Sequence, residues 1–217
     1  MPRTARTVLV GEPHHVVLRG NNRRRLFSYA RDYLGFLKLL LESKTRFAVG
    51  IHAFCLMPNH VHLLATPDDA TALSSAMQRV AQRHAQRRNR LYDSSGKLFE
   101  QRFYSRPIKS DAHLAVATAY IDLNPVRAGI TGTPDEYRWS SFRVHAGLRS
   151  TLPGATELWT PSRWYRALAD GDEERSANYG KWVDFCQAIE HWSDVRKDPP
   201  APSGPAPTRP SRTRAAQ

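Results

Sequence analysis

The chain has 217 residues, 41% of them hydrophobic, and a net charge of +12 at pH 7, which suits one packed domain with extensions, or two small domains. The positive charge favours a polyanionic partner, nucleic acid above all, with an anionic membrane surface as the rival. No apolar run approaches the roughly 20 residues of a membrane span or forms the apolar part of a signal peptide, and two cysteines exclude a disulfide framework, so we expect a cytoplasmic protein.

Seven segments between residues 14 and 124 show the apolar spacing of a strand or a helix. In chain order they predict a strand over 14–19, a helix over 28–44, strands over 47–57 and 60–66, a helix over 71–89, a strand over 102–109 and a helix over 110–124. The second and third strands are expected to form a hairpin through Pro58 and Asn59. This order fits an α+β fold, one antiparallel sheet with helices packed on it.

Two of these segments carry finer signals. In the strand over 47–57, alternation predicts one shared face for the apolar residues Val49, Ile51, Ala53 and Cys55. Ser110 or Asp111 can cap the helix over 110–124. Pro125 is expected to end that helix, because a residue before proline disfavours the α region.

The signals weaken after residue 147. Helices are expected over 159–168 and 178–192. From residue 199 to the end there are six prolines, three arginines and no acidic residue, which is typical of a disordered basic tail. We therefore divide the chain into a main domain over 8–148, a helical extension over 149–195 and a tail over 196–217.

The most specific chemical signal is a pair of histidines, His60 and His62, one residue apart in an apolar run. Side chains at i and i+2 of a strand point to the same face, so the two imidazoles can bind one cation. Taken alone, such a pair is more often two solvated or hydrogen-bonded strand histidines. Its place after a turn and the basic composition favour metal-assisted chemistry on a phosphodiester, with Mg²⁺ or Mn²⁺ as the cation and Zn²⁺ as an alternative.

Tyr120 lies near the end of the last predicted helix, and a tyrosine hydroxyl can act as a covalent nucleophile. Asn124 follows one helical turn later, so its amide oxygen can reach the same cation. A core tyrosine with a satisfied hydroxyl is the common alternative for a helical tyrosine. Tyr104 and Tyr137 compete for the catalytic role on spacing alone.

Arginines recur at four-residue spacing on the helix over 71–89, at positions 79, 83 and 87. A solvated helix face is the usual explanation of such a run. No acidic residue lies between Ala70 and Asp93, so contact with a phosphate backbone explains the stripe better. Arg102 and Arg106 have Phe103 and Tyr104 beside them, and aromatic residues among arginines are typical of proteins that bind single-stranded nucleic acid.

The segments His52–Leu64 and Ala119–Gly129 together resemble the motifs of the REP-associated tyrosine transposases, within the single-tyrosine HUH transposases. The segments His14–Phe27, Leu98–Ile108 and Tyr137–Arg143 are also similar to that family and follow in the family's order. The resemblance covers about residues 8 to 148, and the histidine and tyrosine motifs at this separation are specific.

The resemblance implies a ferredoxin-like sheet, with the histidines on a central strand and the tyrosine on a helix that faces them. It also implies that Tyr120 attacks a phosphodiester of single-stranded DNA, beside an imperfect hairpin. The product is a 5′-phosphotyrosine link that can later be rejoined to another strand. A divalent cation is implied on His60 and His62, with Asn124 at the position of a third ligand.

We expect the family's hairpin DNA as the partner, a location at the nucleoid, and a monomer rather than the alternative dimer. The expected DNA contacts are His15, Arg19, Asn21, Arg23, Arg24, Arg79, Arg83, Arg87, Arg102 and Arg106. A regulator that keeps the fold but has lost catalysis is the main alternative. A histidine-triad-like nucleotide hydrolase is a third hypothesis, but it needs a histidine at position 64, which is Leu64 here.

Overall fold

The computed structural model describes residues 8–188. The tail expected over 196–217 and the end of the helix expected over 178–192 lie outside the described residues. Within them, no helix has the length and apolar character needed to cross a membrane.

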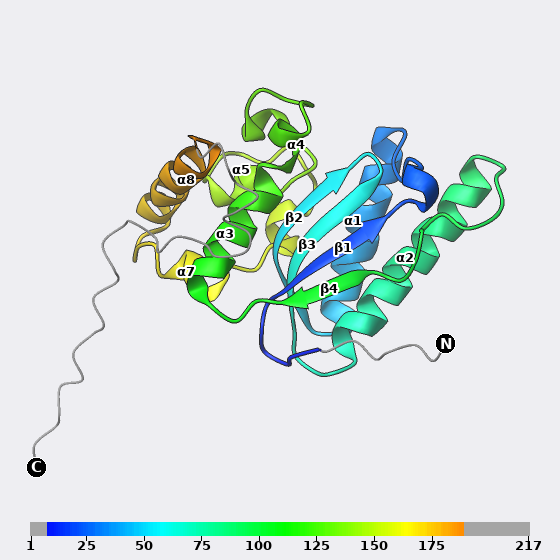
Figure 1. The fold of residues 1–217 in the computed structure, drawn as a ribbon, viewed down its shortest axis with the longest axis horizontal. Helices are drawn as coiled ribbons and strands as arrows, with labels where there is room; N and C mark the ends of the chain where they lie inside the picture. The colour runs from blue at the N-terminus through cyan, green and yellow to red at the C-terminus, as the bar shows by residue number, and fades with distance from the viewer. Residues whose placement is uncertain (1–7, 189–217) are drawn as a thin grey trace, which may run out of the picture.

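A four-stranded antiparallel sheet forms the centre of the fold (Figure 1). Its strands are β1 (His14–Arg19), β2 (Val49–Met57), β3 (His60–Pro67) and β4 (Tyr104–Pro107), in the order β2-β3-β1-β4. The predicted hairpin of β2 and β3 is confirmed. The connection β-α-β-β-α-β, with β1 and β3 at the centre, is ferredoxin-like, so the predicted α+β fold class is confirmed too.

Helices α1 (Ala30–Arg46) and α2 (Ala72–Leu91) pack together on one face of the sheet, and α3 (Asp111–Asp122) packs on the other (Figure 1). Alternation along β3 explains the two layers. Val61 and Leu63 belong to the core that holds α1 and α2, whereas Leu64 belongs to the core that holds α3. The α3 layer contacts β2 and β3.

The prediction of one shared face along β2 is wrong. Val49 and Ile51 lie in the core of α1 and α2, but Ala53 and Cys55 lie in the core of α3. A β-bulge shifts the register between Ile51 and Ala53, and the extra residue reverses the side-chain alternation beyond it. The bulged residue, His52, uses its carbonyl oxygen to accept from the rings of two later residues of the chain.

Helix α3 begins as expected, with the Ser110 hydroxyl accepting from the His113 amide at 3.2 Å. It ends at Asp122, and Asn124 instead begins a separate single turn, α4 (Asn124–Arg127). Pro125 is the second residue of that turn. Because the first turn of a helix tolerates proline, the chain continues as a helical turn where a stop was expected.

Beyond residue 128 the chain forms short turns and one long helix. These are a 3₁₀ turn (Pro134–Glu136), α5 (Phe142–His145), α6 (Ala155–Leu158), α7 (Arg163–Arg166) and α8 (Asp172–Ala188). The helix expected over 159–168 is reduced to α7, because Pro161 excludes the residue before it from a helix and Ser162 caps the turn that follows. Helix α8 starts earlier than expected, with three acidic residues in its first turn that favour a helix N-terminus.

Candidate active site

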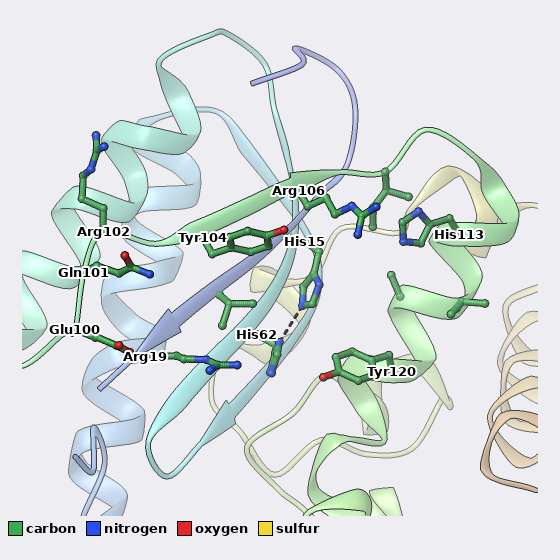
Figure 2. A pocket seen from close by; sticks show the side chains of 14 residues that line it. His15, Arg19, His62, Glu100, Gln101, Arg102, Tyr104, Arg106, His113 and Tyr120 are labelled. Carbon is green, nitrogen blue, oxygen red and sulfur yellow. Dashed lines mark hydrogen bonds between the residues drawn. The ribbon is translucent and has the colours of Figure 1, made fainter. Parts of the chain in front are cut away.

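A cavity of about 480 Å³ opens beside α3, where the sheet face over β1 and β4 is left uncovered (Figure 2). The polar residues that line it come from three strands, the loop before β4 and α3. They are His15, Arg19, His62, Glu100, Gln101, Arg102, Tyr104, Arg106, His113 and Tyr120. A cavity with apolar walls, such as Val17, Ile108 and Val116, into which several polar side chains converge is the first candidate for a functional site.

His60 and His62 stand on the same face of β3, as their spacing predicts, with ring centroids 4.9 Å apart and planes at 85°. His62 is only 4% exposed, and His60 is half-buried. Burial lowers the pKa of His60, nearby Arg19 lowers it further, and a hydrogen bond with Asn124 opposes both effects. The neutral imidazole is the form that binds a metal ion.

Each histidine has a partner on its Nδ1 atom. His60 Nδ1 lies 2.7 Å from Asn59 Oδ1. His62 Nδ1 lies 2.8 Å from His15 Nε2, the contact drawn as a dashed line in Figure 2. His15 comes from β1, whose Val17 is the register partner of His62. The central strands therefore place His15 diagonally beside His62 on the cavity face.

Tyr120 is the tyrosine that lies beside the histidines. Its ring centroid is 5.6 Å from that of His62 and 5.9 Å from that of His15, edge-on in both cases. Figure 2 shows its hydroxyl on the side of His62. The guanidinium carbon of Arg127 lies 5.8 Å from the centroid of the Tyr120 ring.

The two competing tyrosines are placed differently. Tyr104 lines the cavity and is 56% exposed, but it lies on β4, with the whole of β1 between it and His62. Tyr137 is buried, and its hydroxyl donates to the Leu56 carbonyl at 2.7 Å. Burial also raises the pKa of Tyr137. The geometry therefore favours Tyr120 over both.

Asn124 is also close to the histidines, although it belongs to α4. It is a hydrogen-bond partner of His60, and its Nδ2 lies 3.4 Å from the Tyr120 carbonyl oxygen. Among the described residues there is no group of three or more histidine, cysteine or acidic side chains able to hold a metal ion. Two imidazoles and an amide oxygen are nevertheless donors that suit a divalent cation whose remaining ligands come from substrate and water.

The expected DNA contacts fall into separate regions. Arg19, Arg102 and Arg106 line the cavity. Asn21, Arg23 and Arg24 lie in or next to the turn after β1, where the Gly20 amide donates to the Asn59 carbonyl at 2.8 Å. This turn therefore adjoins the residue before His60.

The arginine stripe of α2 lies on the opposite face of the sheet from Tyr120. Arg79 pairs with Glu42 of α1 at 3.5 Å, and Arg87 donates to the Arg31 carbonyl at 3.5 Å. Arg79 and Arg83 also line a second hollow of about 520 Å³ with several glutamines. Contact of this stripe with DNA stays a prediction, and it would require DNA on both sides of the sheet.

Sequence reasoning missed three polar residues that line the cavity, namely Glu100, Gln101 and His113. His113 precedes Tyr120 by seven residues, so helical periodicity places both on one side of α3. Burial lowers the pKa of His113, and nearby Arg106 lowers it further, which favours the neutral ring. Glu100 and Gln101 precede β4 and carry no comparable pattern in the sequence.

Comparison with known proteins shows similarity to a protein family, a curated protein and a solved structure. A family model described as "Transposase IS200 like" matches residues 12–124. A Haemophilus influenzae protein that carries the name REP-associated tyrosine transposase is 28% identical over 130 residues, which cover 54% of this chain and 73% of that protein. The solved structure of a REP-associated tyrosine transposase bound to a REP hairpin aligns with a TM-score of 0.58 and 18% identity, over 75% of this chain and 93% of that one. The last match shows a common fold.

Proposed function

The chain belongs to the family of IS200-like transposases, and we propose that it cleaves and rejoins single-stranded DNA at hairpin sequences through a covalent link to Tyr120. Membership of this family supports a transposase-type enzyme that cleaves DNA. The observation that carries the rest is the position of Tyr120, whose ring lies 5.6 Å from that of His62 beside an open cavity.

In the proposed reaction, the Tyr120 hydroxyl oxygen attacks the phosphorus of a phosphodiester. A bond forms between that oxygen and phosphorus, and the bond from phosphorus to the 3′-oxygen breaks. The phenol gives up its proton, and the leaving 3′-oxygen gains one, so no water is consumed. The 5′-phosphate stays on Tyr120 until a 3′-hydroxyl reverses the step and rejoins a strand.

His60, His62 and Asn124 are the residues that would hold a divalent cation, Mg²⁺ or Mn²⁺. When bound, such an ion polarises the scissile phosphate and stabilises the charge that develops on it. The neutral form of His60, favoured by its burial, supports this assignment. His62 lies beside the Tyr120 ring, and His60 lies beside His62 and is hydrogen-bonded to Asn124, which supports a common site.

The basic and aromatic lining of the cavity supports DNA as the substrate. Arg19 and Arg106 can neutralise phosphates next to the scissile bond. Tyr104 is more than half exposed on the open sheet face, and an exposed aromatic ring can stack on an unpaired base. The solved relative, whose structure was determined with a REP hairpin, supports a hairpin as the target.

We infer that one copy of the chain can form the whole site. The tyrosine and both histidines meet within a single chain, so a partner copy is not needed to complete them. This supports a monomer as the active form, with a dimer as the alternative to be tested by light scattering.

The test is a covalent-trapping assay. Full-length protein is incubated with Mg²⁺ or Mn²⁺ and labelled single-stranded hairpins from repeats that flank its own gene, and the mixture is resolved on a denaturing gel. We expect a protein–DNA band that disappears with a chelator and in Tyr120→Phe, and that persists in the matched variant Tyr104→Phe. Hairpin binding with no adduct under any of these conditions would support the regulator instead.

A further inference from the structure

The tautomers of His60 and His62 decide which of their nitrogens can bind a cation. A neutral imidazole carries one hydrogen, and only the other ring nitrogen offers a lone pair. In metal sites, the second nitrogen of a ligating histidine almost always donates to a neighbouring acceptor, which fixes the ring. The Nδ1 partners of this pair therefore bear directly on the proposed metal site.

Asn59 determines the tautomer of His60. An amide oxygen can only accept, so the contact of 2.7 Å between Asn59 Oδ1 and His60 Nδ1 requires the hydrogen on Nδ1. The lone pair of His60 is then on Nε2. Asn59 is itself held in the tight turn between β2 and β3, where its carbonyl accepts from the Gly20 amide.

His15 plays the same part for His62. The two rings stack with planes at 23° and share one hydrogen between His15 Nε2 and His62 Nδ1, 2.8 Å apart. If His62 donates this hydrogen, its lone pair is on Nε2, as in His60. His62 is nearly fully buried, and the β1–β3 register holds His15 beside it.

We propose that Asn59 and His15 are positioning residues, which hold His60 and His62 with hydrogen on Nδ1, so that each ring presents the lone pair of Nε2, and not an N–H group, to one divalent cation. This inference rests on the proposed function, because it concerns the same metal site. It gives His15 a role other than the DNA contact expected from the sequence, and it gives Asn59 a role where none was expected.

The test measures Mn²⁺ binding to the full-length, DNA-free protein by calorimetry. His15→Leu and Asn59→Ala each remove an acceptor, and we expect each to lower the Mn²⁺ affinity by about 10- to 100-fold. His15→Gln and Asn59→Asp keep an acceptor oxygen in reach, so they should retain most of the affinity. Gln82→Leu, an exposed change on α2, is the control, and thermal unfolding confirms that each variant is folded.

Unchanged Mn²⁺ affinity in folded His15→Leu and Asn59→Ala overturns the proposal. So does an equal loss in the Leu and Gln variants of His15, which would make His15 a direct ligand. Absence of saturable Mn²⁺ binding by the wild-type protein also overturns it. If the expected affinity pattern holds but no covalent adduct forms with DNA, only the proposed function fails.

Discussion

Two polar clusters lie on either side of the last turns of α3, only two residues apart. The cluster around Tyr120 contains His15 and His62 and faces an open cavity. The cluster around Asp122 also contains a histidine and a tyrosine, but it is buried. Its carboxylate accepts from three side chains, namely Ser141 Oγ at 2.8 Å, His145 Nδ1 at 2.6 Å and the Tyr179 hydroxyl at 2.5 Å.

The buried cluster contains serine, histidine and aspartate, as a hydrolase triad does, but its hydrogen bonds differ. In a triad the serine hydroxyl bonds to the histidine, whereas Ser141 donates to Asp122 itself. Both ring nitrogens of His145 are used, Nδ1 with the Asp122 carboxyl group and Nε2 as donor to the His52 carbonyl. Because these polar groups are buried and hydrogen-bonded to one another, we assign the Asp122 cluster a structural role.

The cavity cluster differs in both respects. One hydrogen bond joins its two histidines, His15 and His62, and the open cavity beside them can admit a ligand. Access to the cavity and the pattern of hydrogen bonds therefore distinguish the candidate active site from the buried structural network. The following predictions test this contrast, from the largest expected effect to the smallest.

Tyr120→Phe should lower the rate of covalent adduct formation by more than about 10³-fold, because it removes the attacking oxygen. The ring and its packing beside His62 are retained, so hairpin affinity should change little. Adduct formation is measured on denaturing gels and affinity by fluorescence anisotropy. Adduct formation at the wild-type rate would remove Tyr120 from the mechanism.

Asp122→Ala should lower the free energy of unfolding by about 3–5 kcal/mol, since it leaves three buried side chains, Ser141, His145 and Tyr179, without their shared hydrogen-bond partner. Urea denaturation followed by circular dichroism measures the change. Asp111→Ala, at the exposed start of the same helix, is the control and should change stability far less. A loss below about 1 kcal/mol in Asp122→Ala would contradict the structural role of the network.

His84 should make stability depend on pH. It is a buried residue of α2 that packs against Phe36 of α1. Burial lowers its pKa to about 4, against an ordinary value of 6.5. Since the unfolded chain binds a proton near pH 6.5 and the folded chain does not, His84 costs no stability above that pH and increasingly destabilises the fold as pH falls towards 4. The loss should reach about 3 kcal/mol. The free energies of unfolding of wild type and His84→Gln, measured between pH 6.5 and pH 4, should therefore change relative to each other by about 3 kcal/mol. An identical pH dependence of the two proteins would contradict this role of His84.

Tyr179→Phe should lower the free energy of unfolding by about 2 kcal/mol, because it removes one hydrogen bond to the buried Asp122 carboxylate. Phe185→Ala, an exposed change on the same helix, should stay within about 0.5 kcal/mol of wild type. This pair of variants tests whether α8 is part of the folded unit that holds α3. Equal effects of the two changes would make α8 an independent extension.

Arg106→Ala and Arg83→Ala compare the two basic regions in DNA binding. Each phosphate contact that is lost should reduce the slope of log affinity against log salt by about 0.7 to 0.9. We expect this reduction for Arg106, which lines the cavity, and a smaller one for Arg83 on the opposite sheet face. A larger reduction for Arg83 would place the main DNA surface on α2.

The parts of the site and its helix that could be predicted from the sequence are those that depend on local sequence patterns. The two-residue period of a strand places His60 and His62 on one face, and the Ser110 cap marks the start of α3. The His15–His62 contact depends on the register between β1 and β3, which are more than 40 residues apart in sequence. No local pattern encodes that register, so His15 was assigned to DNA contact instead.

The buried network could not be predicted for a similar reason. Asp122 meets His145 and Tyr179 only because the chain after α4 returns to pack against α3. The bulge at His52 also escaped the alternation rule, since a single extra residue reverses the faces of β2 without changing its composition. Contacts between residues far apart in sequence determine the Asp122 network and the bulge at His52, and local periodicity carries no information about such contacts.

The most direct test of the central claim is to locate the DNA on the protein. Adduct formed with a labelled hairpin is digested with protease and nuclease, and the modified peptide is sequenced by mass spectrometry. The account predicts a nucleotide phosphate on Tyr120 in the α3 peptide. A phosphate on Tyr104 of β4, or on any other residue, would contradict it.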